Sequence, residues 1–338
     1  DNEVIHLISN TVSEYLGQST GMVYSRSMDG GESWDIENVI LDGIGEDDYV
    51  EIGADDYAMA SRGNTICILI GNSWMDLLYM RSDDNGESWE KQIVWEHPYP
   101  LFDPNNTIVT DTFYCMDNTA QMTIDYEGHA HVVFGITRAV SNDDFFGWVY
   151  NQYDDGIVYW NDMMEPFSGE INALAPPQLG YAESELVMDV NYIGWMQDVD
   201  GNGLIELEGL QSYRFSTGMS SMPSITVDEY GQRFVIFSSN TEGFVYTGGS
   251  DPVNYKHLWA RAYANTVWGS FMDLTGDIAH LFDEAYYGCM AKNSDNNIHY
   301  AYFADVAPGT AEDGDHDYHD NYLTYGMLSK SDLITGIG

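Results

Sequence analysis

Short runs in which apolar and polar residues alternate recur along the chain, and turn residues separate them. Gln121–Ile124 is followed by a glycine-containing turn and then by His131–Phe134. The same order recurs at Ser224–Val227 and Phe234–Phe237. Because successive side chains of a strand point to opposite faces, these runs predict β-hairpins with a buried face. No stretch of usable length shows the period of an amphipathic helix, so we expect an all-β protein.

A second repeat has a distinctive sequence. Residues 27–34 read SMDGGESW and residues 82–89 read SDDNGESW. Asp, Asn and Gly suit a tight hairpin turn, because they tolerate positive φ angles or bond to the nearby backbone. We therefore predict a hairpin turn at each repeat, with Trp34 and Trp89 packed back beneath it.

This octapeptide resembles the Asp-box of sialidase-like β-propellers, where it joins the two outermost strands of a blade. The resemblance implies one domain, residues 1–338, folded as a six-bladed β-propeller of four-stranded antiparallel blades. The repeat lengths agree with a propeller. The last blade is short of an outer strand, and we expect Val4–Ile8 to close the ring there. The expected blades span residues 1–45, 50–100, 115–165, 222–275 and 284–331, with an irregular sixth blade or insertion at about 166–221.

The composition narrows the range of partners. The chain carries 55 acidic and 11 basic residues, a formal net charge of -44, which disfavours nucleic acid and anionic membrane surfaces because both require basic patches. Such self-repulsion is relieved by bound cations or by high ionic strength. We therefore expect either calcium-rich or saline surroundings, or acidity that serves solubility alone.

Residues 198–206, read as DVDGNGLIE, place oxygen donors at alternate positions and a glycine at the sixth. Calcium prefers several converging oxygen ligands on a tightly turned loop. The loop resembles the calcium loops of integrin-type and other extracellular propeller repeats. It departs from an EF-hand, because Gly209 stands where the bidentate Glu belongs. A turn without metal is the alternative. The expected calcium ligands are Asp198, Asp200, Asn202, the Leu204 carbonyl and Glu206.

Two other groups of candidate ligands are less specific. Residues 312–320 mix His and Asp without a defined spacing, so they predict either a solvated loop or a transition-metal site. Cys67, Cys115 and Cys289 have no metal-type spacing. We expect free thiols, buried at Cys67 and Cys289, over a disulfide.

Sialidases bind the substrate carboxylate with three arginines, and this chain has seven arginines in all. Four of them adjoin the predicted turns. The remaining Arg138, Arg214 and Arg261 could form a triad, but the N-terminal Arg-Ile-Pro motif of sialidases is absent. The resemblance therefore covers the fold and not the sialidase active site.

Other chemistries of this fold remain open. Polysaccharide lyases on propellers use a His/Tyr pair with an Arg that neutralises a uronate. Two sets of residues offer those side chains, and packed or exposed strand positions are the alternative for both. One set is Tyr126, His129, His131 and Arg138, and the other is Tyr255, His257 and Arg261.

Aromatic residues are abundant, with 25 Tyr and 9 Trp. They are either core residues or exposed rings that stack on sugars or protein partners. The exposed candidates are Trp74, Trp148, Trp195 and Tyr286–Tyr287.

Residues 331–338 resemble the junction before the sorting domain of secreted Bacteroidetes proteins, and Asp1 looks like a processed N-terminus. We expect an extracellular protein, secreted or attached to the cell surface. The preferred function is a calcium-stabilised module that binds glycans or proteins. The alternative is a secreted glycoside hydrolase or polysaccharide lyase with its site in the central funnel.

Overall fold

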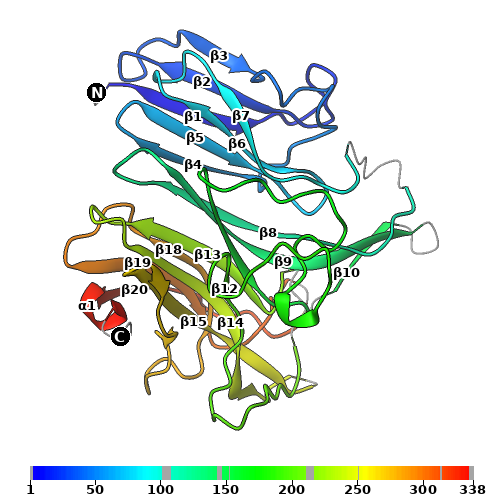
Figure 1. Ribbon diagram of the computed structural model, residues 1–338, viewed down its shortest axis with the longest axis vertical. Coiled ribbons are helices and arrows are strands. Elements are labelled where there is room, and N and C mark those ends of the chain that lie inside the picture. Colours follow the sequence, from blue (N-terminus) through cyan, green and yellow to red (C-terminus); the bar gives the residue numbers. More distant parts are fainter. Residues whose placement is uncertain are drawn as a thin grey trace.

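The computed structural model describes residues 3–100, 108–142, 147–151, 153–210, 217–249, 251–312 and 314–334. These residues form five antiparallel sheets that follow one another in chain order, from the blue N-terminal sheet at the top of Figure 1 to the orange C-terminal sheet at its lower left. The one α-helix among them is the five-residue α1, Lys330–Ile334. The expected all-β class is confirmed.

The first two sheets are meanders, in which each strand pairs with the next one along the chain. The first has three strands and the second has four. Their strands are β1 (Ile5–Asn10), β2 (Met22–Ser27), β3 (Ile36–Val39), β4 (Tyr57–Arg62), β5 (Thr65–Ile70), β6 (Leu77–Ser82) and β7 (Glu90–Trp95).

The third and fourth sheets have longer strands and short additions at their outer edges. In the third, β9 lies between β8 and both β10 and β11, and β12 pairs with β11. In the fourth, β14 lies between β13 and β15, and β15 also pairs with β16 and β17. Their strands are β8 (Phe113–Ile124), β9 (Ala130–Asn142), β10 (Gly147–Asn151), β11 (Ile157–Asn161), β12 (Tyr192–Gly194), β13 (Ser220–Val227), β14 (Arg233–Tyr246), β15 (Val253–Ala264), β16 (Val267–Trp268) and β17 (Met272–Asp273).

The fifth sheet is again a three-stranded meander, formed by β18 (Glu284–Met290), β19 (Asn297–Asp305) and β20 (Tyr322–Ser329). Neighbouring sheets pack face to face. Phe234 and Ile236 of β14 pack toward the fifth sheet, whereas Val235 and Phe237 pack toward the third. A strand buried on both faces needs apolar side chains at every position, which explains the continuous apolar run at 234–237.

Both octapeptide repeats form hairpin turns, as predicted, between β2 and β3 and between β6 and β7. Asp29 and Asp84 make the same bonds: each carboxylate accepts the backbone N–H and the hydroxyl of a serine four residues later. Trp89 packs edge-on against Tyr24 of the first sheet at 5.0 Å between ring centroids. The Trp89 prediction is therefore confirmed, and Trp34 is half-buried.

The segment at about 166–221, where an irregular blade or an insertion was expected, is irregular. The described residues of this segment form no sheet of their own, and β12 adds to the third sheet. Local turns hold the segment instead, such as those in which Ala175 N–H donates to Asn172 O and Val190 N–H donates to Val187 O. Backbone N–H and C=O groups that are bonded in such turns are not available to pair with a neighbouring strand.

The prediction that Val4–Ile8 closes the ring by pairing with the last sheet was wrong. β1 pairs with β2 of its own sheet, and within the described residues no strand of the first sheet pairs with a strand of the last. β20 pairs with β19 alone among those residues.

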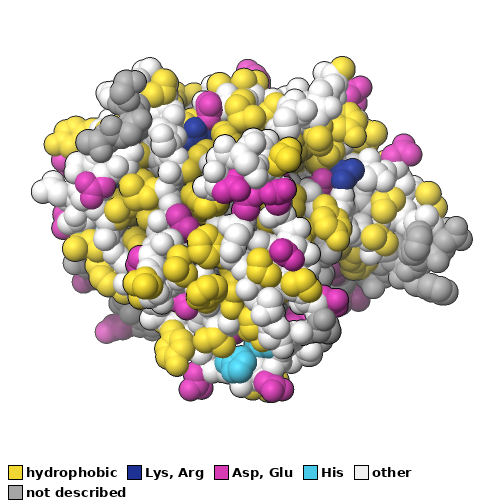
Figure 2. Space-filling model, turned by 90° about the horizontal axis from the view of Figure 1, so that it is seen from below, with side chains coloured by type: hydrophobic (Ala, Val, Ile, Leu, Met, Phe, Trp, Pro, Cys, Tyr) yellow, Lys and Arg dark blue, Asp and Glu magenta, His cyan; other side chains and the backbone are white. Residues whose placement is uncertain are grey.

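All three cysteines are free thiols, as expected, but Cys289 is exposed and the prediction that it is buried was wrong. It lies on β18 beside a register shift, which turns its side chain out of the core. No helix among the described residues has the length and apolar character needed to cross a bilayer. On the face shown in Figure 2, acidic side chains are scattered widely and basic ones are few.

Candidate functional site

The two described arginines of the predicted triad are held apart. Arg138 Nε donates to both oxygens of Asp154, at 2.9 and 3.0 Å. Arg261 is buried, donates from Nη1 to Ile193 O at 2.9 Å and lies 4.4 Å from the Phe271 ring centroid. Asp154 thus pairs with Arg138, whereas Arg261 is held by Ile193 O and Asp189. Arg214 lies outside the described residues.

The first lyase-type set does not assemble either. Tyr126 lies under the Arg62 guanidinium at 4.0 Å, and His129 Nδ1 lies 2.9 Å from Asp162 Oδ1. His131 is buried between Asp125 and Tyr159. These residues lie at one end of β9, whereas Arg138 is nine residues from His129, or roughly 30 Å along an extended strand.

The second set is structural. The Tyr255 hydroxyl donates to Val306 O at 3.0 Å, and His257 is fully buried with its Nδ1 2.7 Å from Asp273 Oδ2. Trp195 also has a packing role, because it stacks on Tyr192 and lies under Arg261. None of these groups faces the pockets described next.

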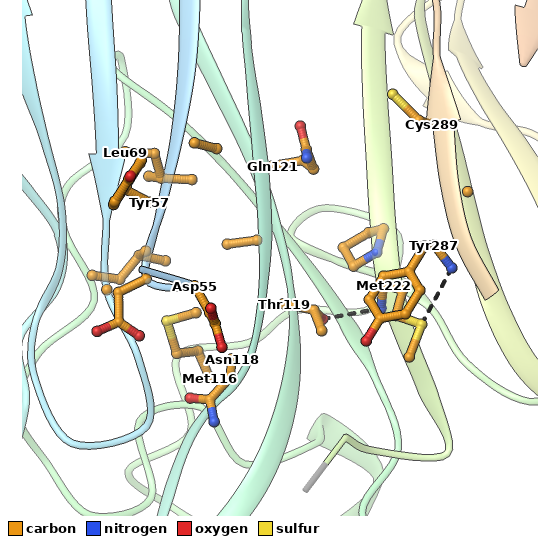
Figure 3. Close-up of a pocket in the computed structure, with 17 residues that line it drawn as sticks. Asp55, Tyr57, Leu69, Met116, Asn118, Thr119, Gln121, Met222, Tyr287 and Cys289 are labelled. Atoms are coloured by element: carbon orange, nitrogen blue, oxygen red, sulfur yellow. Dashed lines mark hydrogen bonds between the residues drawn. The ribbon is translucent and has the colours of Figure 1, made fainter. Parts of the chain in front are cut away.

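A pocket of about 230 Å³, called the central pocket, opens between the first strands of the second to fifth sheets. In Figure 3, Asp55, Tyr57 and Leu69 face Met222 and Tyr287 across it. None of its described lining residues is Arg, Lys or His. The lining comprises Asp55, Asp56, Tyr57, Ala58, Leu69, Gly71, Leu77, Met116, Asn118, Thr119, Ala120, Gln121, Met222, Pro223, Tyr287, Gly288 and Cys289.

Three of the strands around this pocket bulge at the same level. Asn118, Met222 and Tyr287 have φ angles of 61°, 53° and 52°, and each lies within a register shift of its strand. Positive φ is unusual for bulky residues and costs on the order of 1–3 kcal/mol. Such bulges are enriched beside functional sites because they re-aim side chains. Neither Met nor Tyr carries a turn signal, so the sequence could not reveal them.

A second pocket of about 260 Å³ adjoins the central pocket through Asp56 and Asn118. We call it the aromatic pocket. Trp74 and Trp148 stand 6.0 Å apart between ring centroids, at 53° to each other. Trp74 is fixed by a 2.7 Å hydrogen bond from its Nε1 to the Tyr150 hydroxyl. The lining comprises Asp48, Tyr49, Val50, Glu51, Gly53, Asp56, Asn72, Trp74, Met75, Asp76, His97, Pro100, Asn118 and Trp148.

The side chains that line the aromatic pocket are either acidic or neutral. Burial lowers the pKa of His97 to about 4, so the ring is neutral at pH 7. Its Nδ1 accepts the Tyr99 N–H, which leaves the proton on Nε2 to donate to Ser73 O. Burial raises the pKa of Asp56, whose Oδ2 accepts bonds from Gly53 N and Asn72 Nδ2.

The predicted calcium loop, residues 198–206, is called the acidic loop below. It turns as expected: the backbone N–H groups of Gly201 and Gly203 donate to the Asp198 carboxylate. One ligand atom each from Asp198, Asp200 and Glu242 lie within 4.8 Å of one another. This Asp/Asp/Glu cluster could hold a metal ion, because hard cations prefer converging carboxylate oxygens.

Glu242, on β14, is the member that sequence reasoning missed. It is buried, and its two oxygens accept the N–H groups of Val199 and Glu206 at 2.9 and 3.2 Å. The other predicted ligands lie beside the cluster: Asn202 Nδ2 donates to Asp200 and Glu206, and Leu204 is exposed. Nothing local in the sequence around Glu242 marks it as a partner of this loop.

Residues 312–320 behave as a loop in their described part. The His316 and His319 rings stack at 5.5 Å, and His316 Nε2 lies 4.0 Å from Asp305. Within the described residues, this segment brings no three ligand atoms close enough to hold a metal. Asp313 lies outside the described residues.

No protein-family model and no curated protein matches the sequence. Solved structures similar to the chain include a PL25 ulvan lyase bound to -[GlcA(1-4)Rha3S]-, with 12% identity, 98% of this chain and 66% of that chain covered, and a TM-score of 0.48. A thermostable family-43 glycoside hydrolase has 13% identity, 99% and 88% coverage, and a TM-score of 0.40.

The NanB sialidase from Streptococcus pneumoniae has 14% identity, 93% and 36% coverage, and a TM-score of 0.38. This chain therefore spans less than two thirds of the length of the ulvan lyase and of the sialidase. The similar structures are carbohydrate-active proteins of the sialidase, polysaccharide lyase and family-43 types. At these identities and TM-scores the likeness carries no argument about activity.

Proposed function

We propose that the protein is a glycan-binding module on a sialidase-like propeller scaffold, and that its ligand occupies the aromatic pocket and the adjoining central pocket. The observation that carries this proposal is the pair Trp74 and Trp148 in a pocket that adjoins a second one. Indole rings stack on sugar rings, while the Gln121 side chain of the central pocket offers hydrogen bonds to hydroxyls.

Binding without catalysis is favoured by what surrounds the pockets. An acidic sugar requires an arginine or lysine, and the described lining of both pockets has neither. Arg138 and Arg261 are engaged elsewhere. Among the described residues, neither pocket offers the arginine with which sialidases and uronate-neutralising lyases bind a carboxylate.

Calcium would act as a brace. The proposed ligands are Glu242 together with Asp198, Asp200, Asn202, the Leu204 carbonyl and Glu206. Glu242 belongs to β14, so the ion would tie the irregular segment 166–221 to the fourth sheet. An extracellular location, secreted or on the cell surface, suits such a site, because free calcium is abundant there and weak sites are filled.

A second candidate function is that of a glycoside hydrolase, and one observation favours it. Asp55 and Asp56 line the central pocket, and burial raises the pKa of Asp56, as a general acid requires. The strained positions around the pocket are also typical of catalytic sites.

A glycan array combined with a turnover assay, run with and without calcium, tests these alternatives. The binding module predicts retained glycans and no reducing-end or unsaturated product. Measurable turnover that is lost in Asp56→Asn would replace the proposed function with the hydrolase. Absence of glycan binding in both calcium conditions would reject both functions.

A further inference from the structure

The aromatic pocket carries a charge that selects its ligand. Four carboxylates line it, on Asp48, Glu51, Asp56 and Asp76. No lysine or arginine is present among the described lining residues, and His97 is neutral. An anionic ligand in this pocket would meet like charges at short range, which disfavours its binding.

The carboxylates are not equally engaged. Both oxygens of Asp76 are engaged: one accepts a hydrogen bond from the Tyr49 hydroxyl at 2.6 Å, and the other accepts the backbone N–H of His97 at 2.7 Å. Asp56 accepts both of its described bonds through Oδ2. Its Oδ1 therefore retains acceptor capacity at the junction of the two pockets. A cation placed there would stabilise the ionised carboxylate, which burial alone disfavours.

The protein already holds an ammonium group against this wall. Lys91 Nζ lies 4.6 Å from the centroid of the Tyr49 ring and 3.4 Å from Asp48 Oδ1. Tyr49 and Asp48 both line the aromatic pocket, whereas Lys91 does not. Lys91 Nζ also donates to Gly43 O at 2.8 Å, so an aromatic face, a carboxylate and a carbonyl together hold this ammonium.

We propose that the aromatic pocket recognises a sugar bearing a free, protonated amine, with the ammonium near Asp56 Oδ1 and the ring against Trp148. This inference rests on the proposed glycan-binding function and names the ligand class. Trp148 is 41% exposed and contacts Trp74 at 6.0 Å between ring centroids, so a sugar ring would stack on the exposed part of the Trp148 indole while its amine meets the carboxylates. In the central pocket alongside, Gln121 offers hydrogen bonds to hydroxyls of the next residue of the oligosaccharide.

Calorimetric titration of the full chain with three matched oligosaccharides tests the inference: a glucosamine oligomer, its N-acetylated counterpart and a uronic acid oligomer. We expect the glucosamine oligomer to bind at least about tenfold more tightly than the N-acetylated one, because acetylation removes the charge. Binding of the uronate oligomer is expected to be undetectable.

Each outcome separates the inference from the function on which it rests. Equal or tighter binding of the N-acetylated or uronate oligomer would overturn the amine preference and leave glycan binding intact. Absence of binding by all three oligomers, supported by an empty glycan array, would reject both. A lysine-rich peptide that binds while no sugar does would show that the ammonium belongs to a protein partner, which also overturns the inference.

Variants locate the site. Asp56→Asn and Trp148→Ala are each expected to weaken glucosamine oligomer binding about tenfold or more. The control variants Glu14→Gln and Tyr318→Ala change exposed residues that are distant in sequence from both pockets, and they should bind as the wild type does. Melting temperatures identify any variant that misfolds, and Trp148→Ala serves if Asp56→Asn is unstable. Folded Trp148→Ala that binds as tightly as the wild type would contradict the placement.

Discussion

The acidic loop and the aromatic pocket both concentrate carboxylates, but they surround them with different groups. In the loop, the Asp198 carboxylate accepts backbone N–H groups, and the carboxylates of Asp200 and Glu242 converge on it. In the pocket, Asp56 and Asp76 stand among indole and phenol rings. Converging oxygens suit a small hard cation, whereas carboxylates spread along aromatic walls suit an organic cation. Acidity alone therefore does not identify a ligand; the neighbouring groups do.

The largest effect is expected from removing calcium. If free calcium exceeds the dissociation constant a thousandfold, the ion contributes about 4 kcal/mol to the free energy of unfolding. Chelation should therefore lower the melting temperature by several degrees, and Asp198→Asn should make the protein insensitive to chelation. A melting temperature that is the same with calcium and with chelator would show that the acidic loop is not stabilised by calcium.

A pH titration of stability tests the neutrality of the aromatic pocket. His97 has a folded pKa of about 4 and an ordinary value of 6.5, so the unfolded chain takes up the proton first as the pH falls. The wild type should lose up to about 3 kcal/mol relative to His97→Gln between pH 6.5 and pH 4. Unfolding by urea at several pH values measures this difference.

The comparison with His97→Gln is needed because other groups act in the opposite direction. Burial raises the pKa of Asp117 and Asp155 to about 6, and protonation of these carboxylates favours the folded state as the pH falls. These contributions cancel between the two proteins. A constant stability difference across this range would mean that His97 takes up its proton at the same pH in the folded and unfolded states, so burial would not keep the ring neutral.

Truncation of the exposed indole sharpens the assignment of the pocket. Trp148→Ala should weaken glycan binding by about 2 kcal/mol, as is typical of an aromatic anchor. The effect on the unfolding free energy should be smaller, because the side chain is 41% exposed. Isothermal titration and thermal unfolding of the same sample separate the two quantities. A loss of stability that exceeds the loss of binding would identify Trp148 as a packing residue.

How far the sequence predicted these features depends on whether the determinants are local. The hairpin turns at 27–34 and 82–89 were predictable, because Asp29 and Asp84 bond within their own turns. Glu242 joins the acidic loop from 36 residues beyond Glu206, and no local pattern marks such a contact. Features whose determining residues lie close together in the sequence could therefore be predicted, whereas contacts between distant residues could not.

The failed expectations have the same physical origin. The ring closure by Val4–Ile8 required strand pairing between distant segments, which alternation alone cannot specify. Arg138 and Arg261 looked available because their partners Asp154 and Asp189 are remote in sequence. The positive φ angles of Met222 and Tyr287 arise from bulges that packing of the sheets imposes.

The smallest expected effect is the coupling between the two acidic regions. The acidic loop is bonded to the fourth sheet, whereas the aromatic pocket lies on the second and third. Effects at sites without shared partners add to within about 0.5 kcal/mol. The double variant Asp198→Asn/Trp148→Ala should therefore show the sum of the two single changes in stability and in binding. A larger deviation would show that calcium also shapes the glycan site.

The most direct test is a crystal structure of the protein with calcium and a bound glucosamine oligosaccharide. We predict a sugar ring against Trp148, its amine within hydrogen-bond distance of Asp56, and an ion between Asp198, Asp200 and Glu242. A sugar bound instead at Arg138 or Arg261, with the aromatic pocket empty, would contradict the account.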